Sequence, residues 1–164
     1  MNKKGQNELA SETVNALLCG MSLDSIRVYS AVVLLGFFRS GSVTKVDEAW
    51  ISVSGGLWVE SLSQAPKQSV DMKNSSFFYQ RATVLGELYL LIGKEVSSAN
   101  VDLSGALEVV FGQTQIRANS DGDDFEEIWA VMSNTPDADK DHDWYVSLDD
   151  AGQVTTKSPP PATS

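Results

Sequence analysis

One pattern occurs twice in this chain, and it constrains the fold more than any other feature. In residues 17–38, the end of a helical segment is followed by Gly20, a mixed polar and apolar segment, and a continuous apolar run. Residues 90–111 repeat that order, with Gly93 placed 73 positions after Gly20. Units of this size cannot each bury an apolar face alone, so the repeat predicts that they pack together as one pseudo-symmetric domain.

The first unit, residues 8–61, is expected to begin with a helix over residues 8–18. Asn7 is expected to cap this helix, and Gly20 to end it. The apolar face is read as Leu9, Thr13, Ala16 and Leu17. A change to shorter apolar spacing then predicts strands. They are expected near residues 23–28, 31–38, 49–54 and 57–60, the last two joined by Gly55 and Gly56.

The second unit, residues 77–133, is expected to open with a helix over residues 77–92 that ends at Gly93. Its buried stripe is read as Phe78, Ala82, Leu85, Leu88, Tyr89 and Ile92. Strands are predicted over residues 95–101, 106–111, 114–118 and 125–132, before a last hairpin over residues 144–148 and 154–156. The fold class is therefore α+β, with antiparallel sheet and two helices in one domain, residues 1–157, and a disordered tail, residues 158–164.

The repeat also aligns individual residues of the two units. Leu17 aligns with Leu90 at the offset of 73, and Phe37 aligns with Phe111 after one inserted residue. Trp50 and Trp129 are the loosest match. We expect both of these tryptophans in the core, and the pattern does not decide between core and surface for Trp58 and Trp144.

Charge is distributed unevenly between the two halves of the chain. The net charge is −10; residues 1–82 carry +1 and residues 83–164 carry −11. An acidic surface repels nucleic acid and attracts basic proteins. No apolar run reaches the roughly 20 residues of a membrane span. A single cysteine, Cys19, precludes an intrachain disulfide, so the expected setting is the reducing cytoplasm.

Two acidic clusters are the candidate functional residues. With one neighbouring aromatic residue they form the predicted partner-binding set: Asp121, Asp123, Asp124, Glu126, Glu127, Asp139, Asp141, Asp143 and Trp144. Residues 137–143 alternate acids as calcium loops do, but His142 replaces the turn glycine and Leu148 the last glutamate. Solvated acidic loops explain such clusters better than catalysis does. One cysteine and one histidine provide no standard zinc site, and no cofactor is expected.

Several short motifs resemble those of known domains. They are Gly20-Met21-x-Leu23, Gly93-Lys94-x-Val96, Leu107–Phe111 and Phe125–Trp129. The chain, over about residues 15–155, resembles small uncharacterised bacterial domains found in polymorphic-toxin immunity neighbourhoods. It departs from them at Gln113 and in the long insert 135–143. The resemblance supports the fold more than the function, and it supplies no catalytic residues.

The expected function is therefore a non-enzymatic, cytoplasmic acidic binding protein. The favoured class is an immunity-type inhibitor that neutralises a basic partner such as a toxin, with no role for nucleic acid or a membrane. One alternative is a structural or assembly subunit, such as a homodimer, that self-associates through sheet edges or exposed tryptophans. Another is a small enzyme or metal-binding protein that uses the acidic loops.

Overall fold

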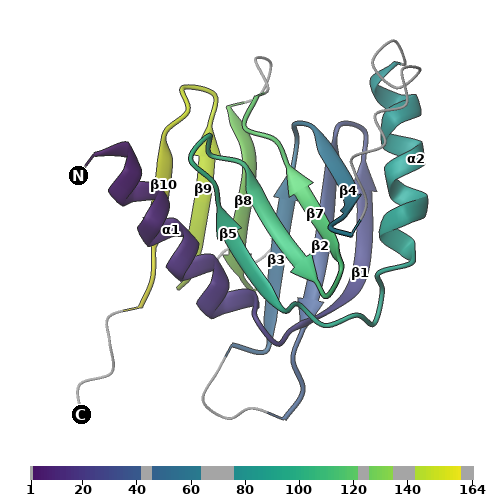
Figure 1. Ribbon diagram of the computed structural model, residues 1–164, viewed down its shortest axis with the longest axis horizontal. Coiled ribbons are helices and arrows are strands. Elements are labelled where there is room, and N and C mark those ends of the chain that lie inside the picture. Colours follow the sequence, from purple (N-terminus) through teal and green to yellow (C-terminus); the bar gives the residue numbers. More distant parts are fainter. Residues whose placement is uncertain (1, 42–45, 64–75, 122–125, 135–142, 160–164) are drawn as a thin grey trace.

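Two antiparallel sheets packed face to face form the body of the protein in the computed structural model (Figure 1). The structure describes residues 2–41, 46–63, 76–121, 126–134 and 143–159. The elements follow in chain order: α1 (Lys3–Leu18), β1 (Ser22–Tyr29), β2 (Val32–Phe38), β3 (Glu48–Val53), β4 (Leu57–Ser61), α2 (Phe77–Tyr89), β5 (Ser98–Val101), β6 (Leu107–Phe111), β7 (Thr114–Ala118), β8 (Glu127–Ser133), β9 (Tyr145–Asp149) and β10 (Val154–Lys157). This confirms the predicted α+β class.

The strand order shows that the chain changes sheets twice. Sheet A has six strands in the order β1-β2-β3-β8-β9-β10, and sheet B has four in the order β4-β7-β6-β5. Strand β4 leaves the first meander to pair with β7, and β8 leaves the second meander to pair with β3. The two helix-plus-meander units thus exchange their fourth strands, which ties them into one sandwich.

The main core lies between the two sheets and is closed by the helices. Its fully buried large side chains include Trp129, Phe37, Leu18 and Leu88. The Trp129 indole N–H donates to the Gly105 carbonyl over 3.0 Å, so this buried polar group is satisfied. A second, smaller cluster lies on the opposite face of sheet A, because side chains alternate along a strand; it comprises Leu34, Trp50, Ala130 and Met132.

The two units meet through backbone hydrogen bonds that repeat when residue numbers are shifted by 73. Gly20 N–H donates to Val96 O over 2.9 Å, and its counterpart Gly93 N–H donates to Leu23 O over 2.7 Å. The second reciprocal pair is Val96 N–H to Met21 O, 2.8 Å, and Leu23 N–H to Lys94 O, 3.1 Å. Reciprocal contacts of this kind are what a twofold axis generates. The geometry is pseudo-twofold, and the duplication of one ancestral unit stays a prediction.

The aromatic residues aligned by the repeat differ in how they are placed in the structure. Phe37 and Phe111 stack on each other, with ring centroids 6.4 Å apart and an interplanar angle of 20°. Trp50 and Trp129 are both buried, as expected, but they are not topological counterparts. Strand β8 holds the place in the second unit that β4 holds in the first. The registers pair Trp129 with Val53 and Leu57 with Ala118, so Leu57 is the counterpart of Trp129. Trp58 and Trp144 are half-buried.

Both helices differ in part from their predicted faces. Gly20 follows the end of α1 in the left-handed conformation as expected (φ 85°). Helix α2 ends at Tyr89, earlier than predicted, and left-handed Gly93 (φ 84°) closes the turn that follows it. Helix α1 begins at Lys3 with Asn2 as its cap, whereas Asn7 lies buried inside the helix. Leu9 and Ala16 are exposed. Thr13 and Leu17 are buried as predicted, and the full buried face is Asn7, Ala10, Thr13, Val14, Leu17 and Leu18.

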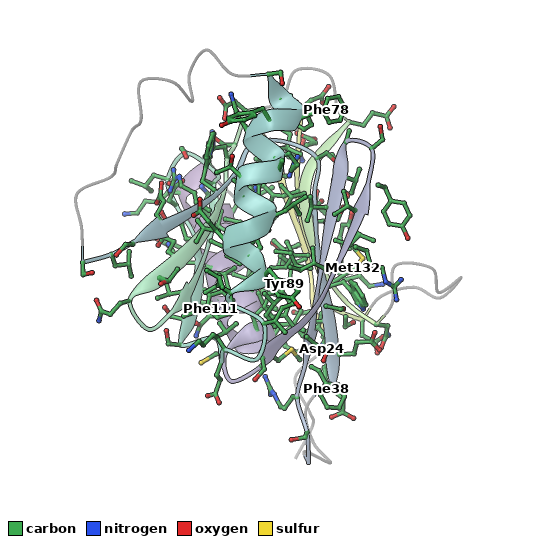
Figure 2. All side chains as sticks on the ribbon, turned by 90° about the vertical axis from the view of Figure 1, so that its right-hand side faces the viewer. Asp24, Phe38, Phe78, Tyr89, Phe111 and Met132 are labelled. Atoms are coloured by element: carbon green, nitrogen blue, oxygen red, sulfur yellow. The ribbon has the colours of Figure 1, made fainter. Side chains whose placement is uncertain are left out.

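In α2 the predicted stripe points largely to solvent. Phe78 and Tyr89 are exposed, and the helix buries Arg81, Val84 and Leu88. Figure 2 shows α2 over the open side of the sandwich, with Phe78 and Tyr89 at its two ends. Leu90, which aligns with Leu17, is 75% exposed. Neither described helix combines the length and apolar character needed to cross a membrane.

Candidate functional site

The structure describes five of the nine predicted partner-binding residues. Asp121 follows β7 and is exposed, Glu126 and Glu127 lie at the start of β8, and Asp143 and Trp144 precede β9. Asp123, Asp124, Asp139 and Asp141 lie outside the described residues, as does His142.

Pairing of β8 with β9 adds two carboxylates that the sequence reading did not include. The register places Glu127 opposite Asp149, and Asp150 N–H donates to Glu126 O over 3.4 Å. We call the set Asp121, Glu126, Glu127, Asp149 and Asp150 the acidic end. Asp149 ends β9 and Asp150 follows it in the turn of the last hairpin, where the sequence pattern predicted a turn at residues 150–152. Antiparallel pairing of residues 127–133 with residues 145–149 was the signal that could have found them.

The acidic end is attached to the points where the chain crosses between the sheets. Ser54 and Gly55 N–H groups both donate to the Ile128 carbonyl, over 2.9 and 3.2 Å. A Cβ at Gly55 would lie 2.8 Å from an Ile128 methyl carbon and 3.1 Å from the Asp121 carbonyl oxygen. Only glycine therefore allows this close approach of the two crossings. The residues that carry the carboxylates are thus joined to the packed crossing at Gly55.

Few positive charges compensate the acidic end. None of its five carboxylates has an ion pair with lysine or arginine within the described residues; the ion pairs there join Lys4 to Glu8, and Arg117 to both Asp102 and Glu108. Exposed carboxylates without counter-charges raise the local negative potential. Asp121, Glu126 and Asp150 are the exposed members.

Glu127 differs from the exposed acids because it has a hydrogen-bond donor on the neighbouring strand. The Tyr145 hydroxyl donates to Glu127 Oε2. Burial and the adjacent Glu127 carboxylate raise the pKa of Tyr145 to about 12. Tyr145 therefore remains a neutral donor at physiological pH. Glu127 serves to join β8 to β9 more than to present charge to a partner.

Asp143 and Trp144 lie at the other end of β8. Ser133 closes that end: its N–H donates to Trp144 O over 3.0 Å, and its hydroxyl oxygen accepts from Trp144 N–H over 3.1 Å. Strand β8 has seven residues, and a strand of that length spans about 20 Å. The described members of the two predicted clusters therefore belong to opposite ends of the sandwich, and half-buried Trp144 packs against the main core.

The described residues contain no metal-ligand cluster. No three His, Cys, Asp or Glu side chains among them are placed to hold one ion. A small pocket lies at the start of α2, lined by Gly55, Gly56, Leu57, Trp58, Phe77, Gln80 and Arg81. Sequence reading did not single out Arg81, because it assigned the buried face of α2 to the aromatic stripe.

Comparison with known proteins assigns no family: no family model, no curated protein and no solved structure matches this chain.

Proposed function

We propose that this protein is a non-enzymatic acidic binding protein, an immunity-type inhibitor that neutralises a basic partner such as a toxin domain. The observation that supports the proposal is the acidic end, where separate segments of the chain bring together carboxylates without Lys or Arg counter-ions among the described residues. The basic partner would contact Asp121, Glu126 and Asp150, the exposed members of the acidic end.

Electrostatic complementarity suits such a role for a physical reason. A fixed patch of like charge speeds the encounter with an oppositely charged surface and discourages wrongly charged partners. The acidic end carries the same sign of charge as nucleic acid, so the inhibitor would compete with nucleic acid for the basic surface of a nuclease. Anchoring at the sheet crossings keeps the patch ordered before binding, which limits the entropy lost on association.

Charge reversal tests the proposal. We expect the triple variant Asp121→Lys, Glu126→Lys, Asp150→Lys to lose capture of the basic protein encoded by the adjacent gene. The matched control, Glu12→Lys, Asp24→Lys, Glu95→Lys, makes the same charge change at exposed positions elsewhere and should retain capture. Wild-type binding should also weaken as salt increases. Equal capture by the two triple variants would remove the acidic end as the binding surface.

A second candidate function, self-association as an assembly subunit, is favoured by the outer face of α2. Phe78, Tyr79 and Tyr89 are 64%, 61% and 71% exposed. The apolar surface for self-association would come from these side chains, because the four tryptophans are buried or half-buried. A molar mass that rises with concentration in wild type, but not in the double variant Phe78→Lys, Tyr89→Lys, would support it. A constant monomer mass would exclude it.

A third candidate, cation binding by the acidic loops, has a direct test. Its alternating acids fall mostly outside the described residues, with Asp143 at their edge. Calorimetric titration with calcium, together with thermal unfolding, decides the point. Heat of binding and a raised melting temperature would support it, and the absence of both would remove it.

A further inference from the structure

The pocket at the start of α2 contains a buried arginine whose hydrogen bonds are incomplete. Arg81 is 6% exposed, and it lines this small pocket. Its Nη2 donates to Gly55 O over 3.0 Å and to Ala31 O over 3.3 Å. Its Nη1 is buried and has no hydrogen-bond partner among the described residues.

Burial of this side chain is electrostatically unfavourable without an anion. Desolvation lowers the pKa of Arg81, yet a guanidinium remains charged at any physiological pH. Within the described part of the chain no carboxylate forms an ion pair with it. Its contacts are neutral: two carbonyls, and the face of the Phe77 ring 4.8 Å from Cζ. A carboxylate would supply the missing negative charge beside the guanidinium.

The pseudo-twofold arrangement shows that anchoring alone does not require a cation here. Asn7 in α1 holds the matching position and donates to Asp102 O, at the turn between β5 and β6, over 2.7 Å. Arg81 in α2 donates to Ala31 O, at the turn between β1 and β2. Both helices thus tie down the turn of the other unit. Because a neutral amide suffices in one unit, the positive charge in the other calls for a further role.

We propose that this pocket binds a carboxylate carried on a short apolar stem. The Arg81 guanidinium would pair with the negatively charged carboxylate, while the Phe77 ring and the half-buried Trp58 would contact the stem. Gly55 and Gly56 form part of the pocket wall. A free organic acid and the C-terminal carboxylate of a peptide share this chemistry. The pocket shares Gly55 with the attachment of the acidic end, but this proposal does not rest on the function proposed for the acidic end.

Two pairs of probes test the proposal with the full chain. Benzoate is compared with benzamide, and a short peptide ending in phenylalanine is compared with its C-terminal amide. Binding is followed by the melting temperature and by tryptophan fluorescence. We expect at least one acid to raise the melting temperature and to bind about tenfold or more tightly than its amide, because an ionised acceptor strengthens the hydrogen bond to arginine. Benzoate binding indicates a free acid; binding of the peptide alone indicates a chain terminus.

Variants connect that preference to the pocket. Arg81→Gln should reduce acid binding about tenfold or more and abolish the difference between acid and amide. The control Arg27→Gln removes an arginine that lies over Trp50 instead, and it should bind as wild type does. Equal binding of acid and amide by wild type, absence of acid binding, or unchanged binding by Arg81→Gln would each overturn the proposal. If Arg81→Gln does not fold, the acid and amide comparison in wild type still decides.

Discussion

The helices α1 and α2 occupy matching places in the two units, yet they pack on the sandwich in different ways. Helix α1 packs against β5 of sheet B and against β10 and β9 of sheet A, so it closes one side of the sandwich from edge to edge. Helix α2 has its main strand contact with β4. The same order of elements therefore gives one helix a structural task and leaves much of the other exposed.

Helix α1 covers a sheet edge with its polar side chains. Residues spaced by four along it, Asn7, Ser11, Asn15 and Cys19, hydrogen-bond to backbone groups from Ser97 to Asp102, on and beside edge strand β5. Ser11 does so twice: its hydroxyl donates to Val101 O over 2.9 Å and accepts from Val101 N–H over 2.8 Å. Exposed strand edges invite pairing with other chains, so this helix protects β5 as a neighbouring strand would.

Helix α2 has the opposite distribution of side chains. It buries a charged residue, Arg81, with Val84 and Leu88, and it leaves Phe78 and Tyr89 in solvent (Figure 2). The comparison teaches that an apolar stripe at helical spacing does not identify the packed face when the opposite face also carries apolar residues. Two features of α2, its exposed aromatic face and the arginine pocket, are not explained by the packing of the helix on the sandwich.

The largest expected effect compares a buried leucine of α1 with an exposed tyrosine of α2. Leu18 is 0% exposed and Tyr89 is 71% exposed. Leu18→Ala should lower the free energy of unfolding by about 2–5 kcal/mol. Tyr89→Ala should change it by no more than about 0.5 kcal/mol. Urea denaturation measures both changes in the free energy of unfolding. Similar losses for the two variants would contradict the assignment of Leu18 to a buried face and of Tyr89 to an exposed one.

Removal of one edge-covering hydroxyl should have the next largest effect. Ser11→Ala leaves Val101 N–H without its acceptor, and we expect a loss of about 1–3 kcal/mol in the free energy of unfolding. Hydrogen exchange at Val101 should accelerate at the same time. Thr83→Ala in α2 is the matched control, because that exposed hydroxyl contacts only its own helix at Tyr79 O. Comparable losses from the two changes would mean that α1 does not seal β5.

The helix-ending glycines test the symmetry itself. Gly20 and Gly93 have φ of 85° and 84°, and nothing lies within 4 Å of a Cβ added to either. Alanine at either position should therefore suffer backbone strain alone, about 1–2 kcal/mol. Because the two sites match, Gly20→Ala and Gly93→Ala should lower stability almost equally in thermal or urea unfolding. A difference well beyond experimental error would show that the two junctions are not equivalent.

The smallest expected effect concerns pH at the turn that Asn7 contacts. Burial alone would raise the pKa of Asp102, but hydrogen bonds from Ser104, Arg117 and Ala106 hold it below its usual value. A depressed carboxyl pKa stabilises the fold at neutral pH, and that contribution disappears as pH falls through the folded-state pKa. Asp102→Asn should therefore unfold with a shallower pH dependence than wild type at acidic pH. Identical pH profiles would contradict the role assigned to the Arg117 and Ser104 contacts.

Several features could be predicted because they depend on short stretches of chain. The glycine after each helix, the apolar strand β2 and the α+β class all follow from local conformational preference and apolar spacing. The acidic end could be predicted only in part. Asp121, Glu126 and Glu127 were in the predicted set, whereas Asp149 and Asp150 joined them through the pairing of β8 with β9.

By itself, the sequence determined the α+β class, the glycine that follows each helix, and the excess of negative charge in the second half of the chain. These are properties of composition and of residues close in the chain. Only the tertiary structure decided which helix faces are buried and that β4 and β8 change sheets. It also placed Arg81 inside and Phe78 outside. The reason is that burial depends on surfaces brought together by strands far apart in sequence. The spacing of apolar residues within one segment does not show which distant strands will pack against it.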